Sequence, residues 1–564
     1  MNIKPGSRFV VPAVVAVLLV VSACATARPA STPPAYACAT AHPLATDACI
    51  AVLANGGNAF DAAVAASAAL AVVEPTGSGI GGGGFWLLHR ASDRYEVFVD
   101  GRETAPAAAH RDLYVDAQGQ PLPERSRFGA ASAGIPGEPA ALEHIARRYG
   151  TRPLAELLQP AIRYAREGFA VDPKLAQMIV RFAPRMSPAA QQVFAPGGQP
   201  LATGALLRQP DLAWTLEQLA THGRNGFYDG PVAERLLAAV QAGGGLWTAG
   251  DLRRYAVVER EPLVSYFRDY RIVSSPPPSA GGLALAQLFQ QLEVLGWRDT
   301  PDAASRHVLV ESLRRAYRDR AAFLGDPDFV LLPQRELASR DYARQLAASI
   351  ETRRATPSAE LPPAPLLREG SDTTHLSVLD AQGNRVAATL SINLPFGSSF
   401  MPEGTGVLLN DEMDDFSTAI GVSNAYGLVG SEPNSIAPRK RPLSSMTPSF
   451  VEGPRGLLIV GTPGGSRIIT MVALGILGWI DGLPLQQVVA LPRIHHQYLP
   501  DELFFEPGAL SAAQQQSLSA LGHTLRMLDA PYGNMQAVSW DGAARVEAAS
   551  DPRGVGTARV VPQR

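Results

Sequence analysis

Two adjacent threonines, Thr373 and Thr374, begin an alternating, strand-like run directly after a proline-rich stretch at residues 357–370. A threonine inside a chain is a weak nucleophile unless a base lies beside its hydroxyl. A threonine at the start of a chain carries its own base, the α-amino group, whose ordinary pKa is about 7.7–8.0. If the chain is cut before Thr373, these residues predict an N-terminal-nucleophile enzyme.

Acyl transfer by such a threonine also needs backbone donors for the oxyanion of the tetrahedral intermediate. Gly464 and Gly465 lie between a hydrophobic strand pattern and a helical pattern. The N–H groups in the first turn of a helix are unpaired and lie at the positive end of its dipole. The segment therefore suits an oxyanion hole, although an ordinary glycine-rich turn has the same composition.

Two further segments could orient a substrate. Residues 410–415 hold four acidic side chains in otherwise apolar surroundings, which suits an ammonium group. A calcium loop would space its ligands differently, so a metal ion is the weaker interpretation, and a solvated acidic turn is the plain alternative. The paired hydroxyls of Ser444 and Ser445 could hold an anion, although serines of this kind are also common in turns.

Both helices and strands are expected to position these residues. Residues 44–73 are helical in pattern, with a corner expected at 55–58 and a second helix that is apolar nearly all round. The region 140–342 is mostly helical in pattern. Beyond Thr373 the pattern predicts strands and a helix, at residues 375–379, 385–392, 456–460 and 466–480. Strands backed by apolar helices in both halves predict a layered α+β or α/β architecture.

A glycine-rich run at residues 77–84 precedes a strand-like segment at 85–88. No Lys-Ser or Lys-Thr pair follows it, and a strand rather than a helix comes next, which argues against a phosphate cradle. Close approach of backbones within a sheet explains the glycines better.

The composition excludes several classes of function. The chain has 564 residues, of which 46% are hydrophobic, so it can bury a large core. Its 49 basic and 52 acidic residues give a formal charge of -3, and no basic patch indicates nucleic-acid binding. Lysine occurs only at Lys4, Lys174 and Lys440, which argues against phosphate-loop and Schiff-base chemistry. No cofactor and no metal ion are implied.

The N-terminus has the pattern of an export signal. Basic residues precede an apolar run at 10–21 that is too short to span a bilayer comfortably. The run ends in Val-Ser-Ala-Cys24, which resembles a bacterial lipoprotein box. We therefore expect a signal peptide at residues 1–24, a flexible tether at 25–38 and a periplasmic protein anchored through lipidated Cys24. Cleavage by an ordinary signal peptidase nearby is the alternative.

Cys38 and Cys49 are the cysteines left over after lipidation. An even number of thiols in an oxidising compartment permits a disulfide, and two separate buried thiols are equally compatible with the spacing.

Several of these segments together resemble the γ-glutamyltransferase (γ-glutamyltranspeptidase) family, from about residue 39 to residue 560. The motifs are long, specific and present in both halves, at residues 56–63, 81–85, 276–282, 321–327, 372–397, 409–417, 442–446 and 464–466. The resemblance implies an α+β fold, the four-layer αββα sandwich of N-terminal-nucleophile hydrolases. It also implies self-cleavage between Asp372 and Thr373, giving a large subunit (39–372) and a small subunit (373–564) that form one interwoven unit.

The resemblance also implies roles for single residues. Thr373 would attack the γ-carbonyl of glutathione or a related γ-glutamyl compound, and the N–H groups of Gly464 and Gly465 would bind the oxyanion. The substrate α-carboxylate would be bound by Arg102, Ser444 and Ser445. The α-ammonium would be held by Asn393, Glu412 and Asp415. Tyr426, in a lid at residues 418–430, would contact Asn393 over the closed site.

Ser391 departs from the family pattern, which has threonine at this position. The family hydroxyl contacts the nucleophile and assists self-cleavage. Serine retains the hydroxyl but loses the methyl group that restricts its rotamer. We therefore expect Ser391 to keep this role, with slower maturation.

The activity expected from the resemblance is γ-glutamyl transfer to amino acids or dipeptides, with accompanying hydrolysis of glutathione by water. An acylase for glutaryl or cephalosporin-type side chains is one alternative, but such acylases commonly lack the lid and need no ammonium pocket. A catalytically inactive binding lipoprotein is the other, and the presence of Thr373, Gly464 and Gly465 speaks against it.

Overall fold

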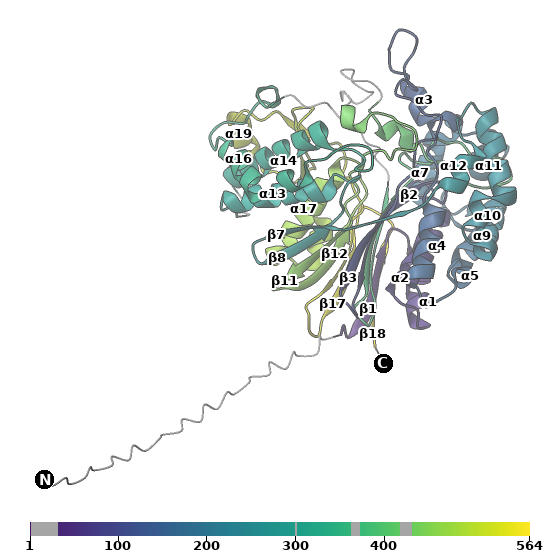
Figure 1. The fold of residues 1–564 in the computed structure, drawn as a ribbon, viewed down its shortest axis with the longest axis horizontal. Coiled ribbons are helices and arrows are strands. Elements are labelled where there is room, and N and C mark those ends of the chain that lie inside the picture. Colours follow the sequence, from purple (N-terminus) through teal and green to yellow (C-terminus); the bar gives the residue numbers. More distant parts are fainter. Residues whose placement is uncertain (2–31, 299, 301, 363–372, 418–430, 564) are drawn as a thin grey trace. The chain divides into compact units, whose positions relative to one another are not determined.

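Two antiparallel sheets form the centre of the protein (Figure 1). The computed structural model describes residues 1, 32–298, 300, 302–362, 373–417 and 431–563. The larger sheet has seven strands in the order β18-β1-β9-β10-β2-β3-β6, and the smaller has six in the order β17-β16-β12-β11-β8-β7.

The seven-stranded sheet draws its strands from the whole length of the chain. These strands are β1 (Ala35–Thr40), β2 (Gly83–Arg90), β3 (Tyr95–Gly101), β6 (Val258–Arg260), β9 (Thr374–Leu379), β10 (Arg385–Ser391) and β18 (Thr557–Pro562). The strands predicted after Thr373, β9 and β10, are antiparallel neighbours near its middle. Because β1 begins at Ala35, residues 35–38 belong to the sheet rather than to the predicted tether.

The six-stranded sheet contains β7 (Leu263–Phe267), β8 (Tyr270–Ser274), β11 (Ser449–Gly453), β12 (Gly456–Gly461), β16 (Gln536–Trp540) and β17 (Val546–Ser550). The β7–β8 hairpin lies inside the region 140–342, which the sequence pattern predicted to be mostly helical. Each of its strands is only five residues long and is flanked by helices. The helical pattern averaged over the whole region therefore does not reveal them. Smaller sheets pair β4 (Phe169–Ala170) with β5 (Leu206–Leu207) and join β13 (Ile494–His495), β14 (Leu503–Phe505) and β15 (Leu525–Met527).

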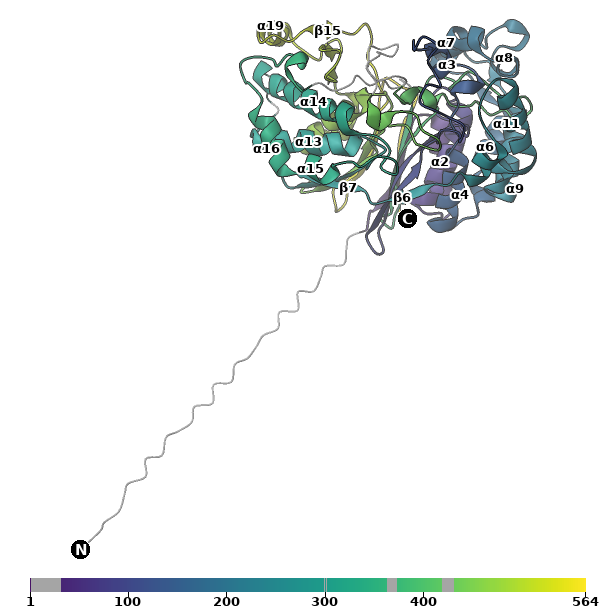
Figure 2. The same ribbon diagram turned by 45° about the horizontal axis from the view of Figure 1, so that its top comes forward.

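Helices cover the outer face of each sheet (Figure 2). Beside the larger sheet lie α1 (Pro43–Ala54), α2 (Ala59–Val73), α4 (Glu138–Arg148), α5 (Leu154–Leu157), α6 (Gln159–Glu167) and α9 (Pro210–His222). Beside the smaller lie α13 (Gly281–Val294), α14 (Ala303–Phe323), α17 (Arg467–Ile480) and α18 (Leu485–Ala490). The remaining helices are α3 (Pro123–Arg127), α7 (Pro173–Phe182), α8 (Pro188–Phe194), α10 (Asn225–Tyr228), α11 (Gly230–Ala242), α12 (Ala249–Arg254), α15 (Gln334–Leu337), α16 (Arg340–Ala348) and α19 (Ala512–Ala520).

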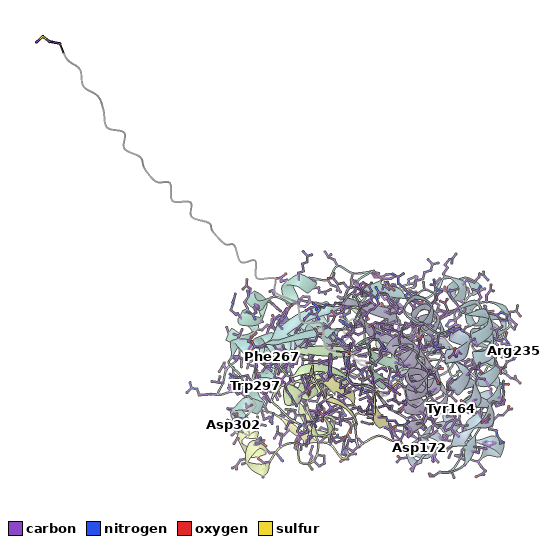
Figure 3. All side chains as sticks on the ribbon, turned by 90° about the horizontal axis from the view of Figure 1, so that it is seen from below. Tyr164, Asp172, Arg235, Phe267, Trp297 and Asp302 are labelled. Atoms are coloured by element: carbon purple, nitrogen blue, oxygen red, sulfur yellow. A yellow bond between two sulfur atoms is a disulfide. The ribbon has the colours of Figure 1, made fainter. Side chains whose placement is uncertain are left out.

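Alternation along β2 shows how the layers are held together. Trp86 and Leu88 pack with the helices α1 and α2, whereas Phe85 and Leu87 pack with Ile459 and the rest of the smaller sheet. In Figure 3, Tyr164 of α6 and Trp297, which follows α13, accordingly lie on opposite sides of the molecule. The predicted four-layer αββα sandwich is confirmed.

The N-terminal helices follow the sequence closely. Asn58 caps α2 and forms a capping box with Asp61, which explains the predicted corner, and every residue of α2 is buried.

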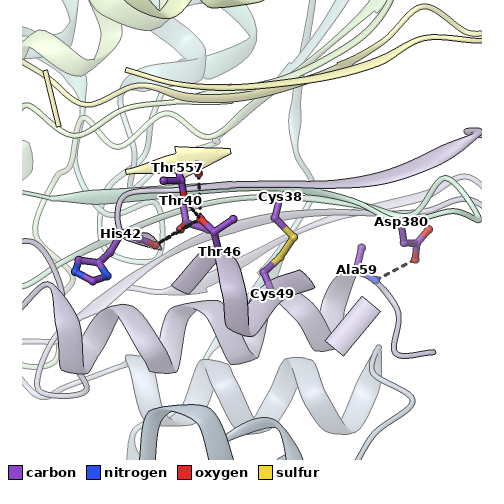
Figure 4. The surroundings of a disulfide bond; sticks show 8 residues. All are labelled: Cys38, Thr40, His42, Thr46, Cys49, Ala59, Asp380 and Thr557. Atoms are coloured by element: carbon purple, nitrogen blue, oxygen red, sulfur yellow. Dashed lines mark hydrogen bonds between the residues drawn. A yellow bond between two sulfur atoms is a disulfide. The ribbon is translucent and has the colours of Figure 1, made fainter. Parts of the chain in front are cut away.

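Cys38 in β1 and Cys49 in α1 form a disulfide, which decides between the two possibilities that their spacing left open (Figure 4). Within the described residues, no helix has the length and apolar character needed to cross a membrane.

The glycine-rich run confirms its predicted role. A Cβ atom at Gly81 would overlap the carbonyl oxygen of Leu408, and one at Gly82 would overlap that of Ser391. Only glycine permits this approach. The run therefore holds the end of β10 and the segment before the acidic turn close to the start of β2.

Candidate active site

Thr373 and Ser391 meet at one end of the central strands. Thr373 directly precedes β9 and Ser391 ends β10, and antiparallel pairing of these strands brings the two residues together. Their Oγ atoms lie 3.5 Å apart, and both residues are buried. The Ser391 hydroxyl also accepts a hydrogen bond from the Asn393 N–H at 2.8 Å. The predicted nucleophile therefore lies beside the hydroxyl expected to assist it.

Replacing Ser391 with alanine should slow self-cleavage by about tenfold or more, which corresponds to about 1.4 kcal/mol in the activation barrier. The variant lacks the side-chain hydroxyl that lies 3.5 Å from Thr373 Oγ1. Conversion of the full-length chain into two fragments can be followed on a denaturing gel. Ser391→Thr is the matched control and should mature at least as fast as the wild type. Unchanged cleavage in Ser391→Ala would remove this residue from the maturation chemistry.

The glycine pair lies between β12 and α17. Gly464 has φ 139° and Gly465 has φ 57°, backbone conformations that favour glycine. The segment begins at Gly461, whose Cα faces the ring of His375 so closely that no Cβ would fit. Burial lowers the pKa of His375 to about 3, so this ring is neutral. The packing brings the start of the glycine segment against β9, two residues after Thr373.

Arg102 is the buried cation of the site. It follows β3 and is 1% exposed. Its Nη1 lies 2.7 Å from Glu412 and its Nη2 pairs with Asp415. Its guanidinium also donates to the carbonyl oxygens of Pro442 and Leu443, each at 3.4 Å. Arg102 thus joins the acidic turn to the segment that contains Ser444 and Ser445.

The electrostatics of this cluster depend on burial. Burial raises the pKa of Glu412 to about 7, although the Arg102 guanidinium acts in the opposite direction. Burial and the neighbouring Glu412 raise the pKa of Asp415 well above its ordinary value. Burial disfavours the Arg102 cation, but Glu412 and Asp415 outweigh this and raise its pKa. A ligand cation bound beside Glu412 and Asp415 would therefore lower their pKa values and favour their ionised forms.

The acidic turn is buried, which excludes the solvated turn considered above. Only two of its four acids, Glu412 and Asp415, pair with Arg102 within the described residues. Asp414 accepts hydrogen bonds from Ser126 and Arg127, away from Arg102. Asp411 accepts from the side-chain amide of Asn393 at 3.0 Å through its carbonyl oxygen and at 3.2 Å through its carboxylate. Asn393 has a φ of 74°, a left-handed conformation that is uncommon for non-glycine residues but that asparagine adopts more readily than most.

Ser444 and Ser445 are buried beside Arg102. The Ser445 hydroxyl accepts a hydrogen bond from Arg320 Nε at 3.2 Å, and that of Ser444 accepts one from the Met446 N–H at 3.1 Å. Arg320, from α14, is a second buried cation that the sequence reasoning missed, and burial lowers its pKa to about 10. It directly precedes the motif at residues 321–327, which is the signal that could have revealed it.

The structure thus forms two groups of predicted site residues. Thr373 and Ser391 form one group. The other contains Arg102, Glu412 and Asp415 with the Ser444–Ser445 segment. Ser391 links the groups, because its hydroxyl is also one of the groups that lower the pKa of Glu412. Asp411, which positions Asn393, was missed as a functional residue. Several predictions lie outside the described residues: the Asp372 side of the cleavage bond, Tyr426 with its lid, and residues 2–31 of the signal peptide and tether, including Cys24.

A threonine at the head of a central strand in an αββα sandwich defines an enzyme of the N-terminal-nucleophile hydrolase class. The gamma-glutamyltranspeptidase family model matches residues 45–561, and the chain belongs to this family.

Two relatives named glutathione hydrolase proenzyme support the assignment. One, from Pseudomonas sp. (strain A14), is 42% identical over 84% of this chain and 83% of its own length. The other, from Escherichia coli (strain K12), is 40% identical over 89% of this chain and 88% of its own length. Among solved structures, a cephalosporin acylase from Bacillus halodurans superposes with a TM-score of 0.81, at 26% identity over 94% of this chain and 97% of that chain.

Proposed function

We propose that this protein is a self-cleaving γ-glutamyltransferase that also hydrolyses glutathione. The observation that carries the proposal is the buried contact of Arg102 with Glu412 and Asp415 beside the Thr373–Ser391 pair. One cation and two acids match the α-carboxylate and α-ammonium of a glutamyl group, whose γ-carbonyl is then directed to a threonine.

The reaction would begin with cleavage between Asp372 and Thr373. The released α-amino group of Thr373 would take the proton from its own hydroxyl as Oγ1 attacks the γ-carbonyl. The N–H groups of Gly464 and Gly465 would stabilise the oxyanion, at roughly 3–4 kcal/mol for one donor in comparable sites. The leaving amine takes the proton, and an amino acid, dipeptide or water then releases the glutamyl group from the ester.

Maturation and location form part of the same proposal. The large subunit would comprise residues 39–372 and the small subunit 373–564, with Tyr426 and the lid at 418–430 closing over the glutamyl group. Lipidated Cys24 would hold the enzyme at the periplasmic face of a membrane. The apolar run at 10–21 and the lipoprotein-like box support this location.

Comparison of γ-glutamyl anilide with glutaryl anilide tests the substrate class, because the two acyl groups differ only in the α-amino group. Without an ammonium, buried Glu412 and Asp415 gain no partner, so kcat/KM should be about 100-fold lower for the glutaryl compound. Release of the aniline can be measured by absorbance, with and without a dipeptide acceptor. Equal or faster release from the glutaryl compound would indicate an acylase, and no release from either would indicate a binding protein.

A further inference from the structure

Glu103 is a buried acid that the proposed reaction does not use. It follows Arg102 directly and is 0% exposed. Neither carboxylate oxygen has a hydrogen-bond partner within the described residues, and its Oε2 lies 3.7 Å from Arg102 Nη1. Backbone encloses it, since a Cβ at Gly83 would lie 2.9 Å from its carboxyl carbon and one at Gly134 would lie 3.1 Å from its Cβ. A buried carboxylate without hydrogen bonds is strongly disfavoured.

The charges around Glu103 make its ionised form still less favourable. Arg102 faces it from the same loop, and Glu412 and Asp415 face Arg102 from the acidic turn. The other titratable groups that act on it are Glu138 from α4 and Tyr255 after α12. If Glu103, Glu412 and Asp415 were all ionised, three buried negative charges would face the single positive charge of Arg102.

Substrate binding separates the roles of these acids. This step rests on the proposed function, in which the glutamyl ammonium lies against Glu412 and Asp415 and stabilises their ionised forms. Glu103 gains no such partner. The substrate carboxylate instead neutralises Arg102, the one cation that faces Glu103 among the described ion pairs. The proton that the cluster retains therefore belongs on Glu103.

We propose that Glu103 works as a neutral carboxylic acid behind Arg102, and that its ionisation sets the alkaline limit for binding of the substrate α-carboxylate. Burial raises the pKa of Glu103 to about 8, against the opposing effect of Arg102. Below this pH the side chain is neutral and does not compete with the substrate carboxylate for Arg102. Above it, a carboxylate 3.7 Å from Arg102 competes with the substrate for the same guanidinium. Glu103 is thus a positioning residue that acts through Arg102.

The test uses two neutral replacements, Glu103→Gln and Glu103→Met, in the full-length protein. Glutamine copies the shape of the protonated acid, and methionine has a similar length and adds no polar group to a site where neither oxygen is hydrogen-bonded. The values of kcat/KM for γ-glutamyl anilide are measured from pH 6.5 to 9.5 and expressed as the ratio of wild type to variant. Ionisation of the substrate ammonium affects every enzyme equally and cancels in this ratio. Glu138→Gln is the matched control, because Glu138 is also a buried acid but is not ion-paired to Arg102 within the described residues.

We expect both Glu103 variants to cleave themselves and to be within about threefold of the wild type at pH 6.5. Above pH 8 the ratio should fall about tenfold for each pH unit, through KM rather than kcat. Glu138→Gln keeps Glu103 and should therefore retain the alkaline decline, from a midpoint no higher than that of the wild type, because Glu138 is one of the acids that raise the pKa of Glu103. A ratio independent of pH would overturn the proposal. So would a loss of more than about tenfold at pH 6.5 in both folded variants, because it would show that ionised Glu103 is required. Absence of wild-type activity at every pH would instead refute the proposed function, and this inference with it.

Discussion

Replacement of Thr373 by alanine is expected to leave the protein as a single full-length chain and to lower γ-glutamyl transfer by at least about 10⁴-fold. In the proposed maturation step, Thr373 Oγ1 would attack the carbonyl carbon of residue 372, and the acyl group would move from nitrogen to oxygen as the nitrogen takes the proton. Water would then hydrolyse this ester and leave Thr373 with a free α-amino group. Alanine has no oxygen for either the cleavage or the later acyl-enzyme.

Mass spectrometry of the wild-type protein should identify a fragment that begins Thr-Thr-His-Leu. Thr373→Ser is the matched control, since it retains the hydroxyl and should still give two chains. Thr374→Ala provides a second comparison. The Thr374 hydroxyl donates to Glu74 rather than contacting Ser391, so its loss should leave the cleavage site unchanged. Two chains from Thr373→Ala would place the scissile bond, and with it the nucleophile, elsewhere.

Local features of the fold followed from the sequence because short-range interactions determine them. The corner at residues 55–58 arises from the capping box of Asn58 and Asp61, which lie three residues apart. The glycines at 81–84 indicated close backbone approach because no other residue fits there. The β7–β8 hairpin was missed because its pairing with β11 depends on contacts far along the chain.

The site could be predicted from motifs only as a set of residue types. Residues 410–415 indicated a cation partner, but not that Asp411 and Asp414 would turn toward Asn393 and Arg127. Asp415 and Arg102 are separated by 313 positions, so their pairing is a product of the fold. The protonation of the cluster depends on burial, which no local pattern reports. The resemblance implied the role of each residue, and the structure showed which of these charged side chains are buried together.

Replacement of Arg102 by lysine is expected to raise KM for γ-glutamyl donors about 10- to 100-fold while changing kcat less. Lysine keeps a positive charge for Glu412 and Asp415, so the variant should fold, but it cannot bind a carboxylate with two parallel N–H donors. Loss of one hydrogen bond to a charged group costs about 1.5–3 kcal/mol, which agrees with that range. The measurement is steady-state kinetics of aniline release over a wide range of donor concentration.

Arg385→Lys is the matched control for this substitution. Arg385, in the central strand β10, is also a buried arginine and pairs with Glu452, but it lies at the opposite end of β10 from Ser391. The Arg385→Lys substitution should therefore leave KM unchanged, although it replaces arginine with lysine in the same way as Arg102→Lys. If Arg102→Lys folded and kept the wild-type KM, the substrate carboxylate would have to bind elsewhere. Arg320, already hydrogen-bonded to Ser445, would be the buried cation to replace next.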